Sequence, residues 1–326
     1  MTIDPRRLGA ALAASLALAA GDAAHAQDVG AAPPGIAASQ PATGATIAPG
    51  ASAATARIAG IDLPVFTYRP AQCTPAMLLV VFHGVQRNGA AYRDHAIPLA
   101  ERLCAIVVAP QFDAARFPRD VYQYGGASAA HGLSRDPRQP RALVAPLVGW
   151  ARQASGIAAP RVVLLGHSAG AQFLDRVAAY DAPDVARIVI ANPSTWVMPS
   201  ATDAAPFGFG GFGVGVGGFG TARDADDADD ADDADDALRA YLAQPITVLL
   251  GTADTGNRHL VRGRMADAQG PTRHARGLHA FQAARAAAES RGWAFGWRLV
   301  EVPGVGHDAP RMFASPEALE AVQGTR

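Results

Sequence analysis

The chain has 326 residues, 49% of them hydrophobic, with 28 basic and 29 acidic side chains and a net charge of −1. This length suits one large α/β domain with peripheral segments, and the apolar content is enough for a sizeable core. The near-zero net charge gives no electrostatic case for binding nucleic acid, and we expect no such partner.

The first 26 residues have the pattern of an export signal. Arg6 and Arg7 precede an apolar stretch from Leu8 to Ala20, and Ala24-His25-Ala26 forms an A-x-A cleavage site. The apolar stretch is too short to be a permanent membrane anchor. We therefore expect a signal peptide over 1–26, a periplasmic or secreted protein, and no stable membrane anchor after cleavage. The alternative is an ordinary buried N-terminal helix.

Residues 27–55 are rich in Ala, Pro, Gly, Ser and Thr and show no apolar periodicity. Such a composition buries too little apolar surface to fold, so we predict a disordered linker here. The folded domain is then expected to cover residues 56–326.

From residue 56 onward, short aliphatic runs alternate with helical patterns. After a strand or hairpin over 58–68, the runs predicted to be strands lie at 77–82, 105–109, 161–165, 187–190, 245–250 and 297–302. The helical patterns lie at 91–103, 141–153, 168–180, 274–291 and 315–322. Uninterrupted Val/Ile/Leu strands between helices predict an α/β fold with a mostly parallel central sheet and helices on both faces. Active sites in such sheets lie at the carboxyl ends of the strands.

One segment, 207–236, does not fit this alternation. Phe207 to Gly220 is a Gly/Phe/Val stretch, and Asp224 to Asp236 is an Asp-Asp-Ala repeat whose acidic side chains repel one another. We predict a disordered, solvated low-complexity insertion. A mobile lid and a calcium-binding segment are the two alternatives.

Cys73 and Cys104 each lie just before a predicted strand. If the two strands are parallel neighbours, both cysteines lie at the same end of the sheet, and an oxidising compartment would permit a disulfide. Two buried free thiols are the alternative. We expect neither cysteine to act as a nucleophile or metal ligand.

The most informative motif is Gly166-His167-Ser168-Ala169-Gly170, between a predicted strand and a predicted helix. A sharp strand-to-helix turn forces its middle residue into a strained conformation and exposes the side chain. Small neighbours are needed there for steric reasons. Ser168 is therefore the candidate nucleophile, and a tight turn with an ordinary serine is the alternative.

A serine hydroxyl needs a base, and the base needs an acid that fixes its tautomer. His307 follows the last predicted strand on a Gly-rich loop, and Asp254 follows the strand that ends at Leu250. The order Ser168, Asp254, His307 is that of the G-x-S-x-G hydrolases. Asp203 is the main rival acid, whereas Asp308 is too close to the base in sequence.

Two backbone N–H groups are expected to stabilise the oxyanion. One is Ala169 N–H, and the other belongs to the His83-Gly84-Val85 loop, where Val85 is the first choice and Gly84 the second. His83 and His167 are expected to be structural.

With these motifs the chain resembles bacterial α/β-hydrolases of the poly(3-hydroxybutyrate) depolymerase and esterase kind. The resemblance covers residues 66–313 without the insertion and rests on the segments 82–88, 108–113, 166–170, 251–254 and 302–308. It implies an α/β-hydrolase fold and a serine esterase that forms an acyl-enzyme. A separate substrate-adsorbing domain is not recognisable, which favours smaller or soluble esters over a solid polyester.

Three aromatic residues near strand ends are candidates for lining the acyl pocket: Trp196, Tyr122 and Tyr124. Core packing is the alternative for each of them. No metal or organic cofactor is implied, and the expected partner is a small or oligomeric ester. A serine peptidase of the same fold, a polyhydroxyalkanoate depolymerase and a non-catalytic binding protein are the alternative functions.

Overall fold

The computed structural model describes residues 47–128, 132–134, 136–210 and 227–324, with only the backbone for 132 and 227–233. All of them belong to one compact unit, Ala38–Arg326. The predicted signal peptide and the predicted linker up to residue 46 lie outside the described residues. No helix among the described residues is both long and apolar enough to span a membrane.

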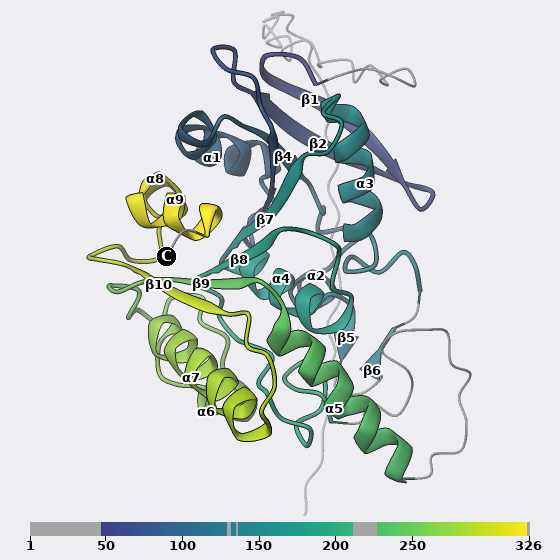
Figure 1. Ribbon diagram of the computed structural model, residues 1–326, viewed down its shortest axis with the longest axis vertical. Helices are drawn as coiled ribbons and strands as arrows, with labels where there is room; N and C mark the ends of the chain where they lie inside the picture. Colours follow the sequence, from purple (N-terminus) through teal and green to yellow (C-terminus); the bar gives the residue numbers. More distant parts are fainter. Residues whose placement is uncertain (1–46, 129–131, 135, 211–226, 325–326) are drawn as a thin grey trace, which may run out of the picture. The chain divides into compact units, whose positions relative to one another are not determined.

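Among the described residues, eight strands form one sheet in the order β1-β2-β4-β3-β7-β8-β9-β10 (Figure 1). The strands are β1 (Gly50–Ile58), β2 (Ile61–Arg69), β3 (Met77–Phe82), β4 (Ala105–Pro110), β7 (Arg161–His167), β8 (Arg187–Ala191), β9 (Ile246–Gly251) and β10 (Arg298–Val302). β2 is antiparallel to both neighbours, and the pairs from β4 to β10 are parallel. β5 (Ala127–Ser128) and β6 (Gly132–Leu133) form a separate small ribbon.

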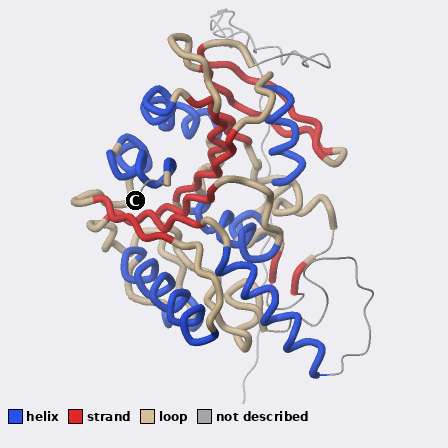
Figure 2. The backbone as a smooth tube through the Cα atoms, in the orientation of Figure 1, coloured by secondary structure: helices blue, strands red, loops and turns tan. Residues whose placement is uncertain are grey.

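Helices cover both faces of the sheet, as the sequence predicted (Figure 2). One face packs against α1 (Gly89–Leu103), α8 (Ala309–Ala314) and α9 (Pro316–Gln323). The other packs against α3 (Val144–Ser155), α4 (Ala169–Tyr180), α5 (Asp227–Ala243) and α7 (Arg273–Arg291). Two short helices, α2 (Arg119–Gln123) and α6 (Arg264–Ala268), lie in loops after β4 and β9. The predicted mostly parallel sheet is therefore confirmed.

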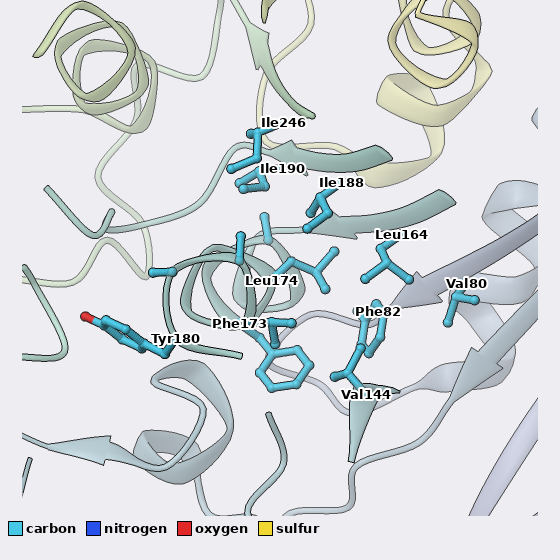
Figure 3. Packing of buried hydrophobic residues seen from close by; sticks show 14 of the residues in the cluster. Val80, Phe82, Val144, Leu164, Phe173, Leu174, Tyr180, Ile188, Ile190 and Ile246 are labelled. Carbon is cyan, nitrogen blue, oxygen red and sulfur yellow. The ribbon is translucent and has the colours of Figure 1, made fainter. Parts of the chain in front are cut away.

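The central strands are buried on both faces, and their side chains divide with a period of two. In β3, Leu78, Val80 and Phe82 contribute to the core beneath α3 and α4, whereas Leu79 and Val81 face α1. Figure 3 shows Phe82 against Phe173 of α4, with ring centroids 5.4 Å apart. Because both faces are apolar, polar side chains are found at the ends of these strands rather than along them.

The described structure starts earlier than the sequence suggested. β1 begins at Gly50 and pairs along its whole length with β2, so the linker prediction is wrong for residues 50–55. Ile47 is also buried, and its N–H donates to Ala154 O at the end of α3. The Ala-rich composition did not indicate a strand. An edge strand that is covered only in part can be built from small residues, because it buries little apolar surface.

The insertion is also more ordered than predicted. The end of the Asp-Asp-Ala repeat forms the first part of α5, and the same helix buries Leu238, Tyr241 and Leu242 in the core. Phe209 is fully buried as well, beside Tyr241 at a ring separation of 5.6 Å. The prediction of disorder is wrong for 207–210 and 227–236, whereas residues 211–226 lie outside the described structure. The lid and calcium alternatives stay open.

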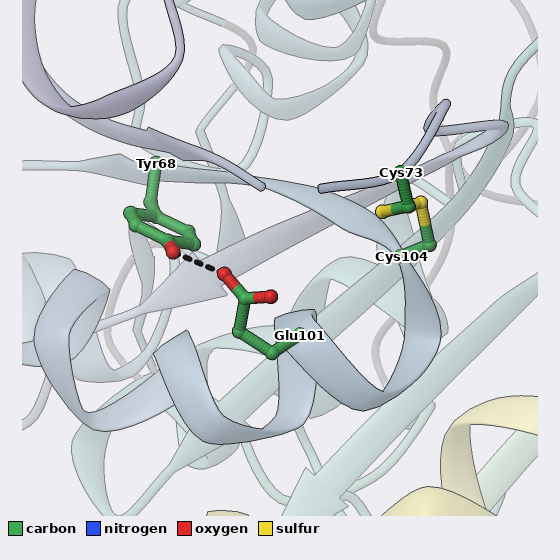
Figure 4. Close-up of a disulfide and its surroundings, with 4 residues drawn as sticks. All are labelled: Tyr68, Cys73, Glu101 and Cys104. Atoms are coloured by element: carbon green, nitrogen blue, oxygen red, sulfur yellow. Dashed lines mark hydrogen bonds between the residues drawn. A yellow bond between two sulfur atoms is a disulfide. The ribbon is translucent and has the colours of Figure 1, made fainter. Parts of the chain in front are cut away.

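Cys73 and Cys104 form a disulfide with a Cα–Cα distance of 6.1 Å (Figure 4). Their strands, β3 and β4, are the parallel neighbours that this pairing required. The bond ties the loop before β3 to the C-terminal end of α1. It lies at the amino ends of β3 and β4, whereas the candidate site lies at the carboxyl ends of the strands.

Candidate active site

Ser168 lies between the end of β7 and the start of α4, with φ 58° and ψ −118°. A positive φ is costly for a residue with a side chain, and the surroundings hold it in place. Its N–H donates to Ala191 O of β8 at 3.0 Å. A Cβ on Gly166 would overlap the backbone of Gly170, and a Cβ on Gly170 would overlap the Phe82 carbonyl. The glycines of the motif therefore permit the tight turn.

The structure brings Ser168, His307 and Asp254 into one hydrogen-bonded chain. Ser168 Oγ lies 2.9 Å from His307 Nε2, and His307 Nδ1 lies 2.7 Å from Asp254 Oδ2. Nδ1 carries the proton that it donates to the carboxylate, so Nε2 can accept from the serine hydroxyl. The His307 side chain is 29% exposed and that of Asp254 only 1%. A partly exposed imidazole is thus oriented by a buried carboxylate.

Backbone pairing holds the acid loop and the base loop together. Thr252 N–H donates to Val302 O and Ala253 N–H to Val305 O, at 3.1 and 3.0 Å. Gly304 N–H donates to Thr252 Oγ1 at 2.9 Å. These bonds extend the parallel pairing of β9 and β10 beyond the strand ends. The relative position of Asp254 and His307 therefore follows from the register of the sheet.

The two rival acids lie elsewhere. Asp308 accepts a hydrogen bond from Arg311 N at 3.0 Å and caps α8. Asp203 forms a turn, in which its N–H donates to Ser200 Oγ and its carbonyl accepts from Gly210 N. Among the described residues, Asp254 is thus the acid that contacts His307.

His167 packs beside the elbow, as predicted. Its ring lies 4.6 Å from that of His307, between the centroids, and its Nδ1 lies 3.4 Å from Tyr92 Oη. Burial holds the pKa of His167 well below its usual range, and the nearby His307 lowers it further. A neutral ring therefore lies under the base and adds no positive charge to it.

His83 fixes the loop after β3. Its Nε2 accepts from Phe112 N at 3.0 Å, so Nδ1 carries the proton and donates to Gly84 O, also at 3.0 Å. Burial lowers the pKa of His83 to about 4. Tyr122 Oη donates to His83 O at 2.9 Å. The loop that carries Val85 is thus held by these neutral, buried side chains and by Arg87, whose Nη1 donates to Phe112 O at 2.8 Å.

The oxyanion candidates differ in what surrounds them. Ala169 is the first residue of α4, so its N–H has no acceptor within the helix. Val85 is 41% exposed, the large apolar side chain that projects most among the described residues. Gly84 N–H interacts with the hydroxyl of Tyr92, which makes Gly84 the weaker second choice. The geometry leaves Val85 and Ala169 as the two donors to test.

The predicted acyl-pocket residues are mostly core residues. Trp196 is fully buried and packs against Trp297 at 6.3 Å between ring centroids. Tyr122 is also fully buried, with the Arg87 guanidinium 4.3 Å from its ring centre. The pocket-lining prediction is wrong for these two, because their rings complete the core beneath the loops. Tyr124 is half-buried and packs edge-on against Phe207.

Sequence reasoning missed one residue that contacts the acid directly. Arg273 is the first residue of α7. Its Nη1 lies 3.5 Å from Asp254 Oδ1, and only 2% of its side chain is exposed. Arg273 is separated from the loop that carries Asp254 by α6, and no sequence motif links the two residues. The only sequence signal is that an arginine follows a helix cap, Thr272.

Comparison with solved structures finds relatives that are more than 30% identical to this chain. A poly(3-hydroxybutyrate) depolymerase, LpqC, from Bordetella parapertussis is 33% identical, with a TM-score of 0.71 over 83% of this chain and 90% of that one. Poly(aspartic acid) hydrolase-1 from Sphingomonas sp. KT-1 is 31% identical, with a TM-score of 0.72 over 85% of this chain and 100% of that one.

A siderophore hydrolase, EstB, from Aspergillus nidulans shares the fold at 13% identity and a TM-score of 0.50, over 86% of this chain and 96% of that one. No family model matches the chain, and no curated protein sequence does so either.

Proposed function

The chain belongs to the α/β-hydrolase superfamily, with poly(3-hydroxybutyrate) depolymerase-like relatives, and on this premise we propose that it cleaves carboxylic esters through an acyl-enzyme on Ser168. The observation that carries the proposal is the chain of two hydrogen bonds, 2.9 and 2.7 Å long, from Ser168 through His307 to Asp254. Such a chain activates a hydroxyl that is otherwise a poor nucleophile.

In the first half of the reaction, Ser168 Oγ attacks the ester carbonyl carbon while its proton moves to His307 Nε2. Asp254 stabilises the imidazolium through Nδ1–H, and the N–H groups of Val85 and Ala169 donate hydrogen bonds to the carbonyl oxygen as negative charge develops on it. Each such donor is worth about 3 kcal/mol in the transition state. The tetrahedral intermediate then expels the alcohol, which takes the proton from His307.

In the second half, water attacks the acyl-enzyme and gives a proton to the same Nε2. The intermediate collapses, His307 returns the proton to Ser168 Oγ, and the carboxylic acid leaves. Both halves need one face of the imidazole open to the substrate, which agrees with the 29% exposure of the His307 side chain.

Amide cleavage is the second candidate, because the relative from Sphingomonas is a poly(aspartic acid) hydrolase and the same residues can attack an amide carbonyl. A panel of p-nitrophenyl esters and p-nitroanilide peptides separates the two. A soluble polyester compared with a suspended one then tests depolymerisation.

Ser168→Ala is the direct test of the proposal. We expect the variant to fold normally and to lose about 10⁶-fold in turnover, as in the strongest precedents. A fluorophosphonate probe should label the parent and not the variant. Near-normal ester hydrolysis by the variant, or a parent that stays unlabelled, would mean that the fold serves binding rather than catalysis.

We also propose that the protein is exported. The N-terminal pattern supports this, as does the Cys73–Cys104 disulfide, since such bonds persist in oxidising compartments. Mass spectrometry of the mature protein should find Gln27 at the N-terminus. A protein that stays in the cytoplasm, or an exported protein that still begins at Met1, would contradict the assignment.

A further inference from the structure

The Asp254 carboxylate has two side-chain partners, one at each oxygen. Oδ2 faces His307 at 2.7 Å, and Oδ1 faces the guanidinium of Arg273 at 3.5 Å. Among the described residues, these are the side chains that contact the carboxylate. The acid of the triad is therefore shared between the base and a buried cation.

Arg273 is fixed from several directions. Its Nη2 donates to Arg258 O at 2.7 Å, and so it bridges the acid to the loop that follows it. The helix that carries it is itself docked on the acid, because His274 N–H donates to Asp254 O at 3.3 Å. Figure 1 shows α7 beside β9, the strand that leads into this loop. The guanidinium has little freedom to leave the carboxylate.

A buried positive charge beside Asp254 changes what the acid does for His307. A lone carboxylate favours the imidazolium, whereas a carboxylate balanced by a guanidinium favours it less. Both side chains are almost fully removed from water, with 2% and 1% exposed, so the charge of Arg273 is weakly screened. Burial lowers the pKa of Arg273, but the Asp254 carboxylate opposes that change and keeps the guanidinium charged.

We propose that Arg273 is a positioning residue of the hydrolytic site, which holds Asp254 in line with His307 and balances the charge of the buried carboxylate. The inference rests on the proposed function. The other groups that face His307 are the buried neutral His167 and, next in sequence, Asp308, which caps α8. His95 of α1 acts on His167 from further away.

Arg276 provides a matched control on the same helix. It is as buried as Arg273, and its Nη1 donates to Ser194 O at 2.6 Å and Val261 O at 2.9 Å. Its carboxylate partner is Asp267, at 3.2 Å, and no contact with Asp254 is present. Arg276 thus tethers the loops after β8 and β9 without touching the acid.

The test compares pH profiles of kcat/KM for the parent, R273M, R273Q, R273K and R276M, with melting temperatures measured on each. Removing the charge should move the acidic limb of R273M and R273Q to higher pH by about one unit, the effect of one close charge. At a fixed pH on that limb, kcat/KM then falls about tenfold. R273K keeps the charge and should keep the limb of the parent. R276M should lose stability without moving the limb.

Unchanged limbs in R273M and R273Q would overturn the inference, and so would an equal shift in R276M. If neither neutral variant folds, R273K decides, because a displaced limb in that variant contradicts the charge-balance role. Failure of the proposed function looks different, since the parent itself would then show no fluorophosphonate labelling and no acidic limb to compare.

Discussion

The two halves of the candidate active site are held by different kinds of force. The loop after β3, which carries Val85, is fixed by two buried neutral groups, the ring of His83 and the hydroxyl of Tyr122, and its Arg87 donates to a backbone carbonyl, Phe112 O, rather than to Asp254 or His307. The loop after β9, which carries Asp254, is fixed by backbone pairing to the loop after β10 and by the charged Arg273. Groups that do not contact the acid or the base can position a donor without changing the charge at the base, whereas a charged group beside the acid affects both the position of the acid and the charge at the base. Mutations in the two halves should therefore leave different signatures in pH and in rate.

The largest effect expected on the charged half is that of Asp254→Asn. The amide keeps the shape but cannot stabilise the imidazolium or enforce the right tautomer, so kcat should fall about 10⁴-fold. Ester hydrolysis under saturating substrate measures it.

Asp308→Asn is the control, because asparagine caps a helix about as well as aspartate. It should retain nearly full activity and stability. If the losses of the two variants were similar, the acid would have been misassigned.

The residues that could be predicted from the sequence are those whose role is fixed by local chain geometry. Ser168, Asp254 and His307 lie within five residues of the carboxyl ends of β7, β9 and β10, so the parallel sheet brings them to the same end of the strands. Secondary structure was predictable for the same reason, since each buried strand is a short continuous apolar run. The Cys73–Cys104 disulfide was one of two predicted alternatives, and it required β3 and β4 to be parallel neighbours, as they are.

What could not be predicted depends on where a side chain points after packing. Trp196 follows a strand just as Asp254 does, yet its ring turns into the core, and Arg273 reaches the acid from a separate helix. The Asp-Asp-Ala repeat suggested disorder because its acidic side chains repel one another. Ala237, Leu238 and Tyr241 at helical spacing on its C-terminal side were the signal that the segment folds as α5.

On the neutral half, the next effect should appear in stability rather than in rate. His83 is buried and neutral, with a pKa lowered to about 4 from 6.5, so the unfolded chain binds its proton first as the pH falls. The stability that depends on this group is complete above about pH 6.5 and declines as the pH falls toward 4. Between pH 7.5 and 5, the loss should be about 2 kcal/mol.

Urea unfolding of the parent and of His83→Gln at several pH values measures this term. The amide oxygen of glutamine can still accept from Phe112 N, but the side chain does not titrate. The variant should lose less stability than the parent on acidification. Its remaining loss includes the contribution of His167, which is also buried and has a lowered pKa. Parallel curves for the two proteins would show that His83 does not supply the pH dependence.

The smallest effect on turnover is expected for Tyr122→Phe, and this variant separates the two halves most clearly. The substitution removes the hydroxyl that donates to His83 O at 2.9 Å and keeps the ring stacked on Phe173 at 5.0 Å. A buried carbonyl without its donor costs about 1–3 kcal/mol of stability. A less firmly held Val85 N–H should lower kcat by several-fold to about tenfold, a fraction of the effect of losing a donor outright. The acidic limb of the pH profile should stay in place, because no charge changes.

Tyr180→Phe is the matched control, because Tyr180 is also buried and its hydroxyl donates to a backbone carbonyl, Gly208 O, at 2.9 Å. It lies at the far end of α4, away from the loop after β3. The two variants should lose similar stability, and only Tyr122→Phe should lose turnover. Equal turnover in both would mean that the oxyanion loop needs no support from Tyr122. A displaced acidic limb in Tyr122→Phe would mean that the neutral half also controls the charge at His307, and the division between the halves would fail.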